Sequence, residues 1–538
     1  MGAHSDPAPA QEETTEEMVA RIGGMVPVAL DAVRAATGFP GQWKAIMVNL
    51  EKLWVCLPIL SSHLGQLESY NNALCREVLQ SVADMLATVT DITGRCQPPL
   101  TAGKLQLRSS IDAVAVKLDV NLRDCELLAK IGELYSDASS SPPLDDTSTC
   151  VQELQRLLAW LQMSHTEAKN LALDGLLQAL HQDEKSVVSI LDDANVSAMV
   201  QLLTASWPMV VREKAATMVC HVAGSCCKDL LVSQGALVPL IRLAGSSSVV
   251  GRRKAAVALH HLSSTSYNAV WVIMSHGVRP LVEMCRQKRG DSVCQLAAAG
   301  TLRNISAERD FQQADHGIVR VMVSLLGRDD AMPESKEHAA QCLQNLTAGY
   351  NGDELPRAVL LEGALRALLL YIGDNNNPHE AAVNAIRNLV RVISTSGMPA
   401  GDTTTMKRLA GKDGSVPLLV QTMLEHNSDT AREVAVQALA GLATYPPNAR
   451  DMNKDDKCVA GLVRLLDPNR YNNATNKYAI QCLLSLASTT KRCRKLMVSH
   501  GANGHLKNLS DMNVQGATEL LQRLERGMLR SLFSGSKQ

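Results

Sequence analysis

The hydrophobic positions of this chain follow a helical period along most of its length. In the stretch "GQWKAIMVNLEKLW", apolar residues stand at positions 43, 46, 47, 50, 53 and 54, and a similar stripe runs from Ile111 to Leu127. Spacings of three and four residues place such side chains on one face of an α-helix. Because these stripes recur between residues 25 and 135, we expect an N-terminal helical bundle of about four helices there.

Two polar segments flank the expected bundle. Residues 1–20 are acidic and small and contain Pro, a composition that predicts a disordered tail. On the other side, "YSDASSSPPLDDTST" combines Ser, Asp and two consecutive Pro residues, which predicts a linker over residues 136–150. The pattern changes beyond this linker, and residues 151–532 form a separate region.

This second region is built on a repeated phrase. The sequence "AAAGTLRNIS" (Ala297–Ser306) returns as "AAQCLQNLT" (Ala339–Thr347) and "AVNAIRNLV" (Ala382–Val390). Its central apolar residue, the marker residue, recurs every 40 to 44 residues, with one longer step of 53, and an Ala stands four positions before each marker. The markers are Leu176, Val219, Leu259, Leu302, Leu343, Ile386, Leu439 and Leu483. Periods near 40 without a strand pattern predict a helical solenoid, and Ala is needed where two helices approach closely.

Glycines keep the same period. Gly235, Gly277, Gly317, Gly363, Gly414 and Gly501 each precede an apolar helix, with Ala194 and Cys458 in the matching positions of two other units. Gly suits a tight corner between helices, because a positive φ costs it nothing. The long step, between Ile386 and Leu439, contains "STSGMPAGDTTT". We expect an inserted surface loop near residues 394–412.

Composition and charge exclude several classes of function. Aromatic residues make up 3% of the chain, and the formal net charge is −1. Base stacking on aromatic platforms and a whole-protein basic field for nucleic acid or anionic lipid are therefore not expected. We find no apolar run long enough to span a bilayer and no signal peptide. We predict a cytoplasmic protein, with the nucleus as a second compartment.

The motifs of common enzymes and metal sites are incomplete. The phrase "HEAAV" at His379 lacks the second His of the zinc-protease motif, since Val383 stands there. There is no P-loop and no G-x-S-x-G. Fourteen Cys are scattered, and the closest group, Cys220, Cys226 and Cys227 near His221, is typical of buried small residues rather than a metal site. We predict no enzymatic activity, no metal and no cofactor.

The repeating unit "G-a-l-v-P-L-i-r-L … A-A-x-x-L-x-N-L" resembles the armadillo repeat over roughly residues 185 to 525. The resemblance implies three helices per repeat, of which the third lines a concave groove. The predicted fold is all-α: a right-handed armadillo-type α-solenoid of about seven to eight repeats, preceded by the helical bundle. The phrases "FPGQWKAIMVNLEKL" and "GKLQLRSSIDAVAVKLDVNLRDCELL" resemble the N-terminal domain of plant armadillo proteins similar to the yeast vacuolar armadillo protein. These resemblances imply a scaffold or adaptor.

The third helix of each repeat carries the candidate binding residues. In importin α and its relatives, the position two residues after the marker holds a groove-facing Asn, and the position two residues before the marker lies on the same face. Amide side chains suit the backbone of an extended peptide, and Arg suits carboxylate or phosphate groups. The predicted groove residues are Arg303, Asn304, Gln341, Asn345, Asn384, Arg387, Asn388 and His261. Two other interpretations remain: a merely solvated helix face, or Asn side chains that bond the neighbouring repeat.

Two departures from the armadillo pattern limit the kinds of partner that we expect. Importin α binds nuclear-import cargo with a Trp two residues before the marker, and no Trp stands at that position here. The groove of β-catenin carries a dense run of Lys and Arg, and these positions carry no such run. We therefore expect a monomeric adaptor whose groove and bundle bind protein partners, with a mixed or mildly acidic extended segment in the groove.

Two alternatives to this adaptor remain open. The first is a membrane tether lipidated at Gly2, although Asp6 stands where the myristoylation pattern wants Ser or Thr. The second is a component of a ubiquitin-ligase pathway without its own U-box. "WVCLPILSSHLGQL" is distantly similar to a U-box phrase, but Leu57 separates Cys56 from Pro58.

Overall fold

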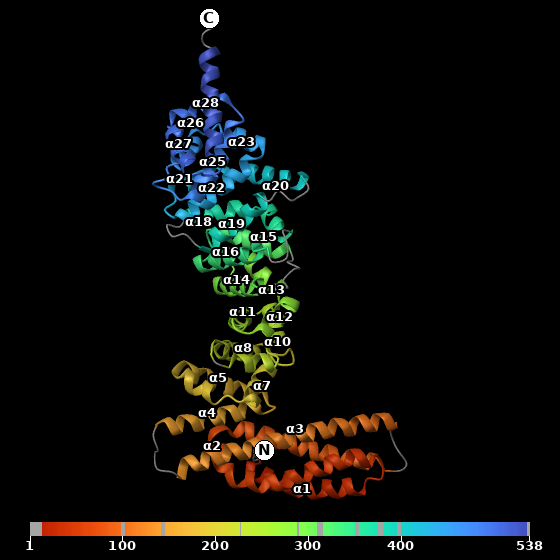
Figure 1. Ribbon diagram of the computed structural model, residues 1–538. Helices are drawn as coiled ribbons and strands as arrows, with labels where there is room; N and C mark the ends of the chain where they lie inside the picture. Colours follow the sequence, from red (N-terminus) through yellow and green to blue (C-terminus); the bar gives the residue numbers. More distant parts are fainter. Residues whose placement is uncertain are drawn as a thin grey trace, which may run out of the picture. The chain divides into compact units, whose positions relative to one another are not determined.

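The computed structural model describes residues 13–97, 103–140, 146–225, 227–287, 290–308, 316–349, 354–374, 380–394 and 400–534. Every regular element among these residues is a helix (Figure 1). The chain divides into two compact units, Met1–Pro239 and Leu240–Gln538. The predicted all-α fold class is confirmed.

Three long helices form the N-terminal bundle: α1 (Thr15–Ala35), α2 (Pro40–Arg95) and α3 (Lys104–Ser140), with α2 packed against the other two. The expectation of about four helices is wrong because α2 continues through Pro58 as one helix. A proline inside a helix removes one backbone hydrogen bond. The buried stripe that includes Ile46, Leu50 and Leu60, each at most 1% exposed, continues on both sides of it.

The bundle begins earlier and ends later than the sequence predicts. Thr14 caps α1 in a capping box with Glu17, so residues 15–20 are helical rather than disordered, and residues 1–12 lie outside the described part of the chain. The predicted linker over residues 136–150 is also wrong at both ends. Helix α3 continues to Ser140, and α4 (Asp146–Gln162) starts at Asp146, which leaves residues 141–145 outside the described residues.

The bundle packs on the first helices of the second region. Asp124 of α3 is 1% exposed and accepts hydrogen bonds from the backbone nitrogen of Ser164, at 2.9 Å, and from its hydroxyl group. His165 lies beside them, with Nε2 3.5 Å from Asp124 and Nδ1 3.2 Å from Glu77. The boundary between the compact units therefore falls after Pro239 rather than at the predicted linker.

The repeats supply the remaining helices. The long third helices are α5 (Thr166–Gln182), α8 (Met209–Gly224), α11 (Val249–Ser263), α14 (Ser292–Ser306), α16 (Pro333–Thr347), α19 (Glu380–Ser394), α22 (Asp429–Ala443), α25 (Asn473–Ala487) and α28 (Ala517–Ser534). The first helices are α6 (Glu184–Ser189), α9 (Lys228–Ser233), α12 (Tyr267–His276), α17 (Glu354–Leu361), α20 (Ala400–Lys412), α23 (Pro446–Met452) and α26 (Lys491–Ser499). The second helices are α7 (Asp193–Gln201), α10 (Leu237–Ala244), α13 (Val278–Arg286), α15 (His316–Leu326), α18 (Ala364–Asp374), α21 (Ser415–Glu425), α24 (Asp456–Arg464) and α27 (Ala502–Asp511).

The marker residues and their alanines form the core of the solenoid. All eight markers and all eight alanines are at most 1% exposed. Since residues four apart share a helix face, this buried row fixes which face of each third helix points inward. The predicted register of the repeats is thereby confirmed.

The glycine corners follow the prediction in part. Gly235, Gly363, Gly414 and Gly501 have φ angles between 78° and 86°, as expected for such corners. Gly277 differs, with a φ of −103°. A Cβ atom there would lie 3.1 Å from the carbonyl oxygen of Ile273, so close approach favours Gly at this position. Gly317 lies inside α15.

The long step between Ile386 and Leu439 contains a helix instead of the predicted loop. Helix α20 (Ala400–Lys412) occupies most of residues 394–412, and residues 395–399 lie outside the described part of the chain. Lys407 on α20 donates to the hydroxyl of Thr444, at 2.7 Å, and its backbone carbonyl accepts from Asn448, at 2.8 Å. Contacts with the end of α22 in the same repeat and with α23 of the next repeat therefore hold a segment whose composition is typical of a loop.

One stretch of α2 has the length and the apolar composition of a membrane-spanning helix. Residues 40–65 of α2 have a mean hydropathy of 1.3 and are long enough to cross a bilayer, contrary to the expectation that no run would be. A single such helix is weak evidence, because buried core helices share this length and composition. One face of this stretch is buried against the bundle, including Trp43, Leu53 and Leu64.

Candidate functional site

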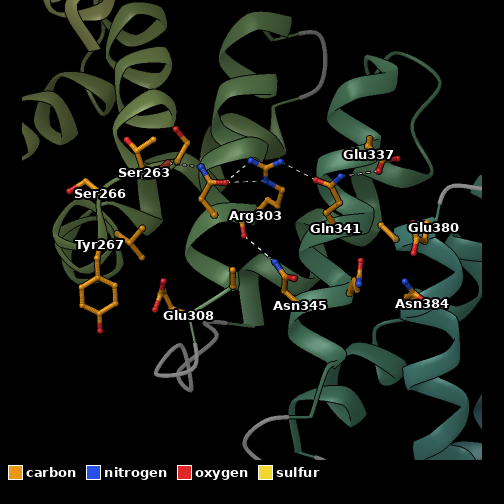
Figure 2. A pocket seen from close by; sticks show the side chains of 17 residues that line it. Ser263, Ser266, Tyr267, Arg303, Glu308, Glu337, Gln341, Asn345, Glu380 and Asn384 are labelled. Atoms are coloured by element: carbon orange, nitrogen blue, oxygen red, sulfur yellow. Dashed lines mark hydrogen bonds between the residues drawn. The ribbon is translucent and has the colours of Figure 1, made fainter. Parts of the chain in front are cut away.

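A polar groove of about 740 Å³ crosses the third helices α14, α16 and α19 and reaches the corner between α11 and α12 (Figure 2). Five of the eight predicted residues line it: Arg303, Asn304, Gln341, Asn345 and Asn384. They meet because the buried markers and alanines turn the polar positions of successive third helices toward the same side.

The asparagines use their amide nitrogens within the solenoid. Nδ2 of Asn304 donates to the Ser263 hydroxyl, at 2.9 Å, and Nδ2 of Asn388 donates to the Thr347 hydroxyl, at 3.3 Å. Nδ2 of Asn345 donates to the carbonyl of Arg303 and to Ser306 Oγ, at 3.2 and 3.1 Å. Each bond reaches the preceding repeat, which agrees with the alternative interpretation for these nitrogens. No described residue donates to Oδ1 of Asn345 or of Asn388.

Arg303 is also held by its neighbours. Its Nε and Nη2 donate to Oδ1 of Asn304, at 3.0 and 2.6 Å, and Nη1 donates to Oε1 of Gln341, at 3.1 Å (Figure 2). Partial burial lowers the pKa of this guanidinium from its usual value. The sequence predicts that Arg303 offers charge to a partner carboxylate. The structure instead gives its donors amide oxygens of the groove wall.

The hydrogen-bond chain continues from Gln341 to a carboxylate. Nε2 of Gln341 donates to Oε1 of Glu337, at 3.0 Å, and the hydroxyl of Tyr371 donates to Oε2, at 3.2 Å. Both donors are neutral groups. Burial and the carboxylate together raise the pKa of Tyr371 well above its usual range, so the hydroxyl stays protonated as a donor.

Carboxylates outnumber cations among the described residues that line the groove. Glu308, Glu337 and Glu380 are three such residues, and Arg303 is the one described guanidinium beside them (Figure 2). These acidic residues were not predicted, because the predicted groove positions lie only one or two residues from each marker. Glu337 and Glu380 stand six residues before Leu343 and Ile386, one turn further along the same face. Counting that additional turn would have found them.

The other three predicted residues lie elsewhere. His261 lines a separate pocket between α11, α14 and α16. Arg387 and Asn388 follow Asn384 on α19 but do not line the polar groove. Nη1 of Arg387 donates to Oδ1 of Asn384, at 2.9 Å, and its side chain is exposed.

The remaining candidate chemistry is not assembled into a site. Among the described residues, no group of three His, Cys, Asp or Glu side chains could hold a metal ion. His379 and Cys226 lie outside the described residues. Cys56 and Pro58 of the U-box-like phrase both lie inside α2, and burial raises the pKa of the Cys56 thiol to about 11.

Stacked three-helix repeats, with third helices lining a groove, define an armadillo-type α-solenoid behind a helical bundle. A sequence-family model described as a domain of unknown function, DUF7032, matches residues 20–133. No curated protein matches the chain.

Similar solved structures include an engineered protein, 21% identical with a TM-score of 0.46, which covers 84% of this chain and 98% of its own. A computationally designed armadillo repeat protein for modular peptide recognition is 23% identical, with a TM-score of 0.38 over 46% of this chain and 99% of its own. A designed armadillo repeat protein in complex with the peptide (KR)4 is 22% identical, with a TM-score of 0.36 and the same shares covered.

Proposed function

We propose that this protein is a non-enzymatic scaffold that binds an extended peptide segment of a partner protein in the polar groove. The observation that carries the proposal is the groove itself: about 740 Å³ of open space, continuous over successive repeats and lined by amide, hydroxyl and carboxylate groups. Such a lining offers hydrogen bonds to a peptide backbone, whose amide groups need partners when they leave water.

The groove lining favours particular contacts. Both hydrogens of Asn345 Nδ2 are used within the solenoid. No described residue donates to its Oδ1, so this oxygen can accept from a backbone N–H of the segment. The three glutamates favour a segment with a basic side chain, whereas the sequence predicts a mixed or mildly acidic segment. No described residue favours the membrane tether, and Gly2 lies outside the described part of the chain.

The test uses the whole chain and a phage-displayed library of random dodecapeptides. An enriched peptide is synthesised with a fluorescent label, and its affinity is measured by anisotropy. In the variant Gln344→Trp, an indole would occupy the groove, which Gln344 lines without a side-chain hydrogen bond to a described residue. We expect affinity to fall at least tenfold in this variant. Gln522→Trp, at an exposed position of α28, is the matched control and should bind as wild type does.

A library that enriches no peptide, or two variants that bind equally, would overturn the proposal. Alanine substitutions of Asn304, Asn345 and Asn388 make a poorer test, because each side chain bonds the preceding repeat. Their loss would lower stability together with binding. The thermal midpoint of each Trp variant must therefore match that of wild type.

A further inference from the structure

A second pocket, of about 620 Å³, lies next to the polar groove between α11, α14 and α16. It is lined by Val257 of α11, by Val293, Leu296 and Ala297 of α14, by the imidazoles of His260 and His338, and by Glu334 and Glu337 of α16. Val293 is 39% exposed, so apolar carbon is open to solvent at this place. We refer to it as the apolar pocket.

The shape of the apolar pocket depends on a glycine, which has no side chain. Gly300 stands two residues before the marker of α14, and a Cβ atom there would lie 2.4 Å from Cε1 of His260. The His260 ring therefore packs directly over the α14 backbone. Its centroid is 5.8 Å from that of His338 on α16. A larger residue than Gly would push the ring away and change the shape of the pocket.

The imidazoles of His260 and His338, which line the apolar pocket, are neutral near pH 7. Burial lowers the pKa of His260 to about 4, assisted by His338, Arg303 and His261 nearby. Burial and Arg303 also lower the pKa of His338. Nδ1 of each ring is buried without a hydrogen-bond partner among the described residues. Neutral imidazoles and aliphatic side chains suit an apolar group, and Glu334 and Glu337, which also line the pocket, suit a basic group beside it.

The apolar pocket lies beside the polar groove, since Glu337 lines both. On α16, the pocket contacts residues from Pro333 to His338 and the groove contacts residues from Glu337 to Asn345. Their centres are therefore about five or six residues apart, or roughly 8 Å at a rise of 1.5 Å per residue. An extended chain covers this distance in two to four residues, at about 3.3 Å each.

We propose that the apolar pocket is a second subsite for the segment bound in the groove. The occupant is an extended segment of a partner protein with a basic side chain and, two to four residues away, a Leu, Ile, Met or Phe side chain. The basic side chain lies against Glu308, Glu337 and Glu380, and the apolar side chain fills the pocket over His260 and His338. This inference rests on the proposed function, since the groove must first bind the segment.

The first part of the experiment is the composition of the peptides that the library enriches. We expect Lys or Arg together with a large apolar residue at the stated spacing. Enriched peptides that are acidic, or that lack a large apolar residue, would overturn the inference. They would leave the proposed function standing.

The second part measures the apolar contact directly. Val293→Trp places an indole at the opening of the apolar pocket, and Val250→Trp places one at an exposed position of α11 away from it. Burying a large aliphatic side chain changes affinity about tenfold or more. We expect Val293→Trp to weaken the selected peptide at least tenfold and Val250→Trp to leave it unchanged. A peptide with Ser in place of its apolar residue should bind both variants equally.

The outcomes separate the two proposals. If Gln344→Trp abolishes binding while Val293→Trp has no effect, the groove binds peptide and the second subsite is wrong. If neither variant changes binding, both proposals fail. Should Val293→Trp lower the thermal midpoint, Leu296→Gln gives a second reading, because it makes the pocket wall polar with little change in volume. Equal binding of the selected peptide to Leu296→Gln and to wild type would then overturn the inference.

Discussion

At the residue scale, the clearest unfavourable feature is a buried cation, the ammonium of Lys169. Lys169 of α5 is 6% exposed; its ammonium donates to the carbonyl of Leu161, at 2.8 Å, and lies 4.9 Å from the ring centroid of Trp207. These contacts offset only part of the cost of leaving water, and burial lowers the pKa of Lys169 to about 8. The folded chain therefore binds fewer protons than the unfolded chain between about pH 8 and 10.5. Its stability falls as pH falls through that window.

This burial predicts that Lys169→Met stabilises the protein at neutral pH. We expect a gain of about 1–2 kcal/mol at pH 7, because the lost hydrogen bond to Leu161 contributes about 1 kcal/mol and the removed burial cost is larger. The gain should shrink at pH 9.5, where the folded side chain is largely neutral. Thermal midpoints at the two pH values measure it. Lys185→Met, at an exposed position, should show no such trend; equal gains at both pH values would contradict the explanation.

At the element scale, one carboxylate joins the bundle to the first repeats. Asp124 of α3 accepts from the backbone nitrogen and the hydroxyl of Ser164, in the turn between α4 and α5. Because Asp124 is almost completely buried, its removal leaves buried donors without a partner. The contact is therefore specific to the docked arrangement of these helices within the first unit.

We expect Asp124→Ala to destabilise the first unit by about 2–4 kcal/mol. Hydrogen exchange should become faster in α3, α4 and α5 and remain as in wild type in α22 and α25. Asp119→Ala is the matched control on the same helix, since Asp119 is exposed and its one ion pair with a described residue is that with Arg123, at 3.6 Å. If Asp119→Ala and Asp124→Ala lower protection equally, Asp124 does not hold the bundle on the repeats.

At the scale of the whole molecule, positive and negative charges nearly balance, and an excess of one sign occurs only in particular places such as the groove. The formal net charge is −1, so the chain has no strong overall field, while the described residues that line the groove include three glutamates and one guanidinium. The described cysteines form no disulfide. Burial of side chains between successive repeats, rather than covalent links, therefore holds the solenoid together.

Local charge predicts a salt-dependent partner. For a selected peptide with two basic residues, raising NaCl from 0.1 to 1 M should weaken binding about tenfold, because the screening length falls from about 10 Å to about 3 Å. Anisotropy titrations at both salt concentrations measure the change. The same peptide with Gln in place of its basic residues should change less than twofold; equal weakening of both peptides would show that the glutamates do not attract the segment.

Much of the architecture was predictable because it depends on short-range spacing. An Ala four residues before each marker sets the buried face of a third helix, whichever partner that helix meets. Boundaries were less predictable. At Thr14 a capping box starts a helix inside an acidic tail, and in α20 contacts of Lys407 with Thr444 and Asn448 hold a segment of loop-like composition.

The sequence by itself determined the all-α solenoid, the register of its repeats and the face that carries the groove, because a helical period and a repeat length need no knowledge of distant contacts. Only the tertiary structure decided how the groove side chains are used. Bonds such as those from Asn304 to Ser263 and from Arg303 to Gln341 join residues 41 and 38 positions apart. These bonds use the side-chain N–H groups of Asn304 and Arg303 within the solenoid, whereas the sequence predicts that they bind a partner. The carboxylates of Glu308, Glu337 and Glu380 then set the charge of the groove, and His260 packed over Gly300 forms a pocket that neither residue predicts alone.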